Sequence, residues 1–195
     1  MTEPVARTWQ RIVTLLQDSA PATARVIRPP SPGAEVRRAL SVLPADLPHD
    51  LLGWWAAMDG IDDERDYRAG AVIPHHFVPL AVPRVREEYL RQQNYPDDRC
   101  CTADDRHRMP AGVPVFPYCT ALVPVCRSID GGPLCVDTRP GERYGCLMHW
   151  YASEGAYAVE WSSVTHMLTD VADRLATGEA ATGDEGMLTW DSDLG

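Results

Sequence analysis

Residues 123–175 read VPVCRSIDGGPLCVDTRPGERYGCLMHWYASEGAYAVEWSSVTHMLTDVADRL, and this stretch decides the fold. Turns rich in glycine, proline or polar residues at 130–132, 139–142 and 153–155 separate short apolar runs. In the last run Tyr157, Val159 and Trp161 alternate with other residues, as on a half-buried strand. Because such short connections join antiparallel neighbours, the stretch predicts an antiparallel meander.

A helix is expected directly after the meander. Ser162 or Ser163 is a suitable N-cap, and Gly178 is a suitable end because glycine tolerates the left-handed conformation. Between them, apolar residues recur at helical spacing and define one buried face. These are Val164, Met167, Leu168, Val171 and Leu175.

The residues before the meander predict helices with few strands. We expect helices over 7–17, from Pro32 to about 42 with Ser31 as N-cap, over 48–58, and over 83–92. Residues 71–73 predict a short strand, and 94–112 a long polar loop of unassigned role. The whole pattern predicts one α+β domain over 1–178, with a mixed, largely antiparallel sheet and helices packed on it.

The tail, residues 179–195, holds five acidic residues and no basic one. Residues 187–190 (MLTW) either dock as a final strand or belong to a mobile tail. Because the tail follows the last expected helix and is polar, we expect its removal to leave a folded domain.

The formal net charge of −10 argues against binding to nucleic acid or to an anionic membrane, both of which need clustered positive charge. An acidic surface suits a basic protein partner, or it only keeps the chain in solution. The start of the chain lacks the pattern of a signal peptide, and prolines interrupt its most apolar stretch, 113–126. We therefore expect a cytoplasmic protein whose six cysteines are reduced.

Motifs for catalysis and metal binding are absent from the sequence. There is no C-x-x-C pair, no G-x-S-x-G motif and no phosphate-binding loop, and the chain contains no lysine. We expect buried thiols, an ordinary loop pair at His75-His76, no metal, no cofactor and no enzymatic activity. A Cys–His couple stays open, since such partners can be distant in sequence.

Two groups of residues are candidates for contact with a protein partner. Trp54 and Trp55 are adjacent on an expected helix, so either one is buried and the other partly exposed, or a wide apolar face buries both. The acidic candidates around the meander turns are Asp130, Asp137, Glu142 and Glu160. Asp130 and Asp137 either contact the partner or only shape their turns.

The order of motifs along the chain resembles the SUKH superfamily, which includes a fungal cell-wall-assembly regulator and bacterial toxin-immunity proteins. Residues 29–60 resemble the family's P-P-A-S…L-P-x-D-L…N-G segment, and Trp9 with Ile12 and Leu16 its opening helix. The meander carries the other matches: Asp130-Gly131-Gly132, 134–137, Pro140-Gly141, 145–147 and 163–168.

This resemblance implies an α+β fold with a mixed sheet, and a binding module without catalytic residues. The first expectation is an immunity protein that neutralises a bacterial toxin, a basic toxin domain being one candidate partner. The alternatives are a regulatory scaffold or adaptor in cell-envelope or signalling control, and a small enzyme that uses cysteine chemistry.

Overall fold

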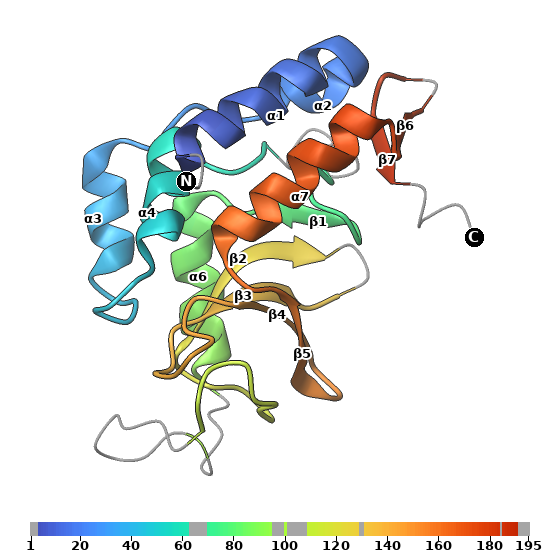
Figure 1. The fold of residues 1–195 in the computed structure, drawn as a ribbon. Helices are drawn as coiled ribbons and strands as arrows, with labels where there is room; N and C mark the ends of the chain where they lie inside the picture. Colours follow the sequence, from blue (N-terminus) through green and yellow to red (C-terminus); the bar gives the residue numbers. More distant parts are fainter. Residues whose placement is uncertain are drawn as a thin grey trace.

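The computed structural model describes residues 4–62, 70–94, 100, 109–128, 131–183 and 185–190 (Figure 1). It has the expected α+β architecture. One sheet has five strands in the order β1-β2-β3-β4-β5, and its described pairings are all antiparallel. The strands are β1 Phe77–Pro79, β2 Leu122–Ser128, β3 Pro133–Asp137, β4 Leu147–Tyr151 and β5 Gly155–Trp161.

The helices are α1 Val5–Ser19, α2 Pro21–Arg25, α3 Gly33–Leu40, α4 His49–Ala57, α6 Val82–Gln92 and α7 Val164–Thr177. Helix α7 begins and ends as predicted: the Ser163 side chain accepts the backbone N–H of His166, and Gly178 is left-handed. The predicted N-cap of α3 is wrong, because Pro32 occupies that position and no side chain caps the helix. None of the helices in these ranges is long and apolar enough to cross a membrane.

The predicted strand at 71–73 is also wrong. Only Ile73 forms a bridge there, with Phe77, across a tight turn. His75 and His76 have positive φ in this turn, of 64° and 57°. Histidine is one of the few residue types besides glycine that adopts this conformation with some frequency. The strand therefore begins after the turn, as β1.

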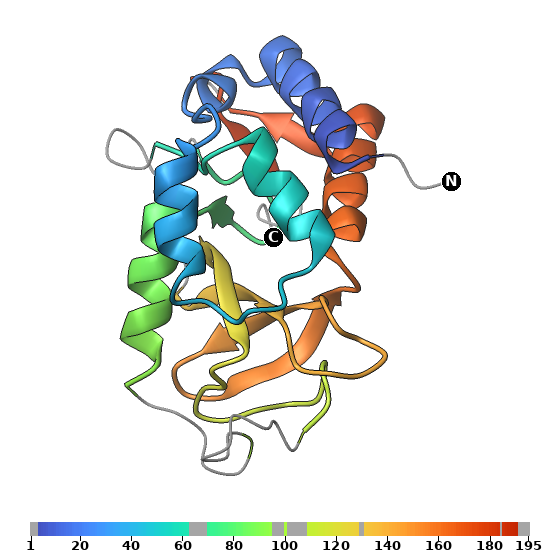
Figure 2. The ribbon, with the colours of Figure 1, turned by 90° about the vertical axis from the view of Figure 1, so that its left-hand side faces the viewer.

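One face of the sheet and the helices enclose the larger hydrophobic core. Side chains alternate along a strand, so Leu134 and Val136 of β3 enter this core together with Leu147 of β4. Trp9 of α1 meets Trp54 of α4 edge to face, with ring centroids 6.1 Å apart. Figures 1 and 2 show α1, α4 and α7 together at one end of the sheet.

A second, smaller core lies on the other face of the sheet. Cys135, Met148 and Trp150 point into it from β3 and β4, and the segment before β2 covers it with Val115 and Tyr118. This segment also reaches the outer edge of the sheet, where Val115 pairs with Ala156 of β5. The two cores leave few side chains of the central strands in contact with solvent.

The turn between β2 and β3 depends on a glycine. Gly132 has a φ of 78°, and a Cβ atom built there would lie 1.9 Å from the carbonyl oxygen of Trp150. A larger residue at this position would therefore collide with the backbone of β4. This constraint explains the second glycine of the Gly131-Gly132 pair.

The tail docks on the body of the protein. Strands β6 Ala180–Thr182 and β7 Leu188–Trp190 form a two-stranded antiparallel sheet. Leu188 and Trp190 are buried in the larger core, and Trp190 Nε1 donates to the carbonyl oxygen of Ala71 at 3.2 Å. Of the two alternatives for residues 187–190, the structure has the docked strand, and removal of 179–195 would expose this surface.

We expect Trp190→Ala to lower the free energy of unfolding by about 3–5 kcal/mol, because it empties a buried site of aromatic size. The matched control is Glu185→Ala, at an exposed residue between β6 and β7, which should stay within about 0.5 kcal/mol of the wild type. Denaturant unfolding of the full chain measures both. Equal stability of the two variants would contradict the docked tail.

Candidate functional site

The two tryptophans proposed for partner contact are both interior residues. Trp54 is 1% exposed and Trp55 3% exposed. Of the two alternatives, the structure has the wide apolar face that buries both rings, and the expected partly exposed tryptophan is not present on α4. Neither ring can touch a partner while the helix stays packed.

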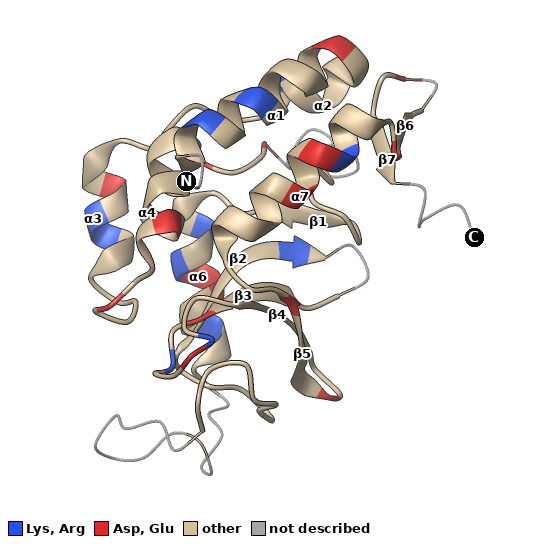
Figure 3. Cartoon of the chain, in the orientation of Figure 1, with Lys and Arg blue, Asp and Glu red and all other residues tan. Residues whose placement is uncertain are grey.

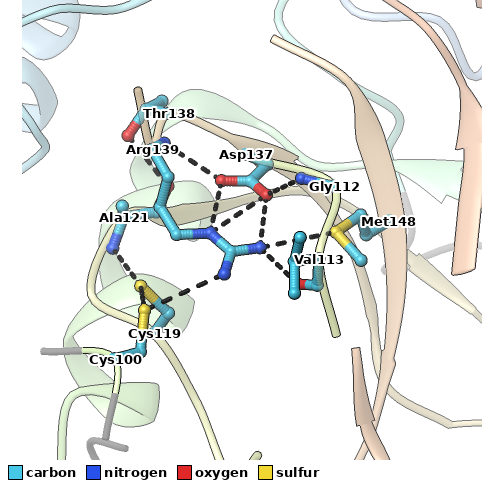
Figure 4. A network of polar contacts seen from close by, with 9 residues as sticks. All are labelled: Cys100, Gly112, Val113, Cys119, Ala121, Asp137, Thr138, Arg139 and Met148. Atoms are coloured by element: carbon cyan, nitrogen blue, oxygen red, sulfur yellow. Dashed lines mark hydrogen bonds and ion pairs between the residues drawn. The ribbon is translucent and has the colours of Figure 1, made fainter. Parts of the chain in front are cut away.

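Asp137 is buried as well, at the end of β3. Its carboxylate accepts from Nε of Arg139 at 3.0 Å and from Nη2 at 2.6 Å, and it also accepts the backbone N–H of Gly112 at 2.8 Å (Figure 4). Both charged side chains have no exposed surface. Asp137 therefore shapes its turn and does not meet a partner, which corrects its assignment to the binding surface.

The guanidinium of Arg139 extends this network to the segment before β2. Nη2 donates to the carbonyl oxygen of Val113 at 2.7 Å, and Nη1 donates to Sγ of Cys100 at 3.8 Å. Burial acts to lower the pKa of Arg139, but hydrogen bonding to the Asp137 carboxylate and its charge outweigh burial and raise the pKa above its usual value. The arginine is therefore charged at every pH at which the fold persists.

The turn between β3 and β4, residues 138–146, is fixed at its base by this ion pair. Thr138 donates both its backbone N–H and its hydroxyl to the carbonyl oxygen of Ala121. Asp137 and Gly145 close the turn, since the N–H of Gly145 donates to the carbonyl oxygen of Asp137 at 2.8 Å. A turn held at both ends presents its outer side chains in a fixed geometry.

Those outer side chains adjoin a hollow on the surface, which we call the Tyr144 hollow. Its volume is about 710 Å³, and its lining is mainly apolar: Leu40, Pro44, Ala45, Leu47, Pro48 and Leu52, with Asp46, His49 and Tyr144. Tyr144 is 39% exposed, and its hydroxyl donates to the carbonyl oxygen of Asp46 at 2.9 Å. Glu142 is exposed two residues before it.

Glu160 lies at the same end of the sheet. It is the extra residue of a β-bulge in β5, since Leu147 pairs with Trp161 while Met148 pairs with Val159. The bulge directs the exposed Glu160 away from the ladder. Asp130, the remaining acidic candidate, lies outside the described residues.

The described surface does not carry a single sign of charge. Figure 3 shows arginines on α1, α3 and α6 and acidic residues on α3, α4 and α7. Much of the chain's acidity belongs to sequence outside the described ranges, such as Asp97-Asp98 and Asp104-Asp105. Around the Tyr144 hollow the exposed charges are mixed, with Asp46 and Glu142 beside Arg143.

Sequence reasoning missed Arg139 and Tyr144. The run Asp137-Thr138-Arg139 reads as an ordinary polar turn, and nothing in it shows that both charges are buried. The hollow joins the turn to residues 40–52, which are about 100 positions away in the sequence. The only available signal was the aromatic residue within a turn, a position where exposed aromatics often serve binding.

Among the described residues, no group of three or more His, Cys, Asp or Glu side chains is placed to hold a metal ion. No protein-family model matches the chain. No curated protein matches it either.

We expect Asp137→Ala to lower the free energy of unfolding by about 3–5 kcal/mol, since it leaves the charge of Arg139 buried and unpaired. The control is Glu87→Ala, which breaks an ion pair with Arg84 in which both side chains are more than half exposed. Exposed pairs contribute at most about 1 kcal/mol. Similar losses in the two variants would show that burial of the Asp137–Arg139 pair is of no consequence.

Proposed function

We infer that the chain is a protein-binding module and that its partner docks on the Tyr144 hollow. One observation carries this proposal: a part-exposed aromatic side chain stands at an apolar hollow, on a turn held by a buried ion pair. Partner residues that fill such a hollow would lose their contact with water. Interface residues that contribute most of the binding free energy usually lie in such desolvated pockets.

Preorganisation adds to the suitability of this surface. The Asp137–Arg139 pair fixes one side of the hollow, and α4 with its preceding loop forms the other. Asp50 of α4 ties this side to the body, because its carboxylate accepts the backbone N–H of Thr165 in the first turn of α7 at 2.9 Å. A rigid surface loses little conformational entropy on binding.

The resemblance to the SUKH superfamily and the exposed acidic residues favour one kind of partner, a basic toxin domain. In this proposal the chain is an immunity protein, and Glu142 and Glu160 flank the contact. A regulatory or adaptor role would use the same hollow for a different protein. Producing the chain in the same cells as a toxin encoded beside its gene separates these two roles. Only an immunity protein would restore the growth of cells that make the toxin.

The role of the hollow in binding is tested with a partner that is captured from solution by the full-length chain and identified by mass spectrometry. We expect Tyr144→Ala to weaken its affinity at least about tenfold by calorimetry, as for an interface hot spot. The matched control is Tyr157→Ala on β5, a tyrosine that is 51% exposed away from the hollow. If Tyr157→Ala weakens binding and Tyr144→Ala does not, the partner docks elsewhere.

Charge reversal tests the acidic part of the surface. We expect Glu142→Arg and Glu160→Arg to slow association with a basic partner and to reduce its dependence on salt, because charge steering is screened over about 10 Å at 0.1 M ionic strength. Both residues are exposed, so the melting temperature should hardly change. Glu154→Arg, on the exposed turn between β4 and β5, is the control. If the association rate changes neither with salt concentration nor with either charge reversal, electrostatic steering does not contribute to binding of the partner.

A further inference from the structure

The second core contains two thiols in contact. Sγ of Cys100 lies 3.5 Å from Sγ of Cys119, and neither residue has exposed surface. Nη1 of Arg139 donates to the Cys100 sulfur at 3.8 Å, and the backbone N–H of Ala121 donates to the Cys119 sulfur at 3.5 Å (Figure 4). Protein binding at the Tyr144 hollow makes no use of this arrangement.

The surroundings of Cys100 favour a thiolate. The hydrogen bond between the Cys100 and Cys119 sulfurs, with the charge and hydrogen bond of Arg139, lowers the pKa of Cys100 to about 5, although burial alone would raise it. The other described cysteines with resolved shifts behave oppositely: burial raises the pKa of Cys126 and Cys135, and that of Cys146 to about 11. A thiolate is the form that peroxide oxidises, and a neighbouring second thiol condenses with the resulting sulfenic acid to form a disulfide.

Two other roles fit these contacts less well. A soft metal ion between the sulfurs would lie close to the guanidinium of Arg139, whose positive charge opposes it. Packing alone would not place a charged donor on the Cys100 sulfur, because a buried thiol usually behaves as a small hydrophobic group. We propose that Cys100 and Cys119 are a redox pair that hydrogen peroxide converts into a disulfide, with Cys100 as the attacking thiolate. This proposal is independent of the protein-binding function.

The reaction takes two steps. The Cys100 thiolate attacks one peroxide oxygen, so an S–O bond forms, the O–O bond breaks, and the leaving hydroxide takes up a proton as water. Cys100 is now a sulfenic acid, oxidised by two electrons, and the peroxide is reduced. The Cys119 sulfur then attacks the Cys100 sulfur: the S–S bond forms, the S–O bond of the sulfenic acid breaks, and the leaving hydroxide takes the Cys119 proton as a second water.

The geometry requires little movement for this second step. The sulfurs are already in contact and must approach from 3.5 Å to about 2.05 Å. Because both thiols are buried, the oxidant must be small. Hydrogen peroxide meets this condition, whereas a bulky disulfide such as glutathione disulfide does not.

The test uses the reduced full-length chain with hydrogen peroxide, followed by alkylation under denaturing conditions and peptide mapping by mass spectrometry. We expect one disulfide, between Cys100 and Cys119, with Cys126, Cys135 and Cys146 alkylated. The rate of oxidation at pH 6 should exceed that of the urea-unfolded chain by about tenfold, since few ordinary thiols are ionised at that pH. Glutathione disulfide should leave the folded chain unchanged.

Variants separate the roles of the two sulfurs. In Cys119→Ser the sulfenic acid on Cys100 should persist and be trapped by dimedone that is added together with urea after the peroxide is removed, whereas Cys146→Ala should still form the disulfide. The oxidised wild type should melt about 5–10 °C higher, because the bond joins residues 19 positions apart. A disulfide to Cys101, a bound metal ion in the purified chain, or oxidation no faster than in urea would each overturn the proposal.

Discussion

The buried ion pair between Asp137 and Arg139 is the interaction on which the C-terminal half of the structure depends. Two opposite charges without solvent are stable only when nearly all their hydrogen-bonding groups are satisfied. The carboxylate therefore accepts the backbone N–H of Gly112, and the guanidinium donates to the carbonyl oxygen of Val113. These bonds bring the segment before β2 over the sheet and close the second core. They also fix the turn that borders the Tyr144 hollow.

The sheet separates the two cores, and segments from both the N-terminal and the C-terminal part of the chain cover the larger one. Helix α1 packs on α7 and α4, while β7 returns to place Trp190 among the same side chains. The backbone N–H of Leu188 donates to the hydroxyl of Thr23 at 2.9 Å, which joins the tail to α2. An acidic, polar tail thus contributes two of the buried apolar residues that the core needs.

The helices and the meander could be predicted from the sequence because their signals are local. Periodic apolar residues, paired glycines and a serine cap need no information from distant parts of the chain. The errors occurred where a distant contact decides the outcome. Asp59 follows the end of α4, and its carboxylate accepts the N–H of Val82 at the start of α6, a contact that no local pattern indicates. The predicted Ser31 cap is the exception, because its error is local: α3 begins at Gly33, so Pro32 occupies the N-cap position. For the site, exposure of Glu142 and Glu160 follows from their charge, whereas burial of Asp137 follows only from Arg139.

Arg139 also connects the two proposed activities physically. A guanidinium has five N–H donors, and a carboxylate in bidentate contact uses only part of them. In this chain the remaining donors reach the Val113 carbonyl and the Cys100 sulfur. The group that makes the turn rigid is therefore the one that favours a thiolate nearby. Oxidation of Cys100 would remove the negative charge from one acceptor of Arg139, while the Asp137 carboxylate would stay in place. The turn should then keep its shape, because the bonds that hold it come from Asp137 and Thr138 and not from the sulfur.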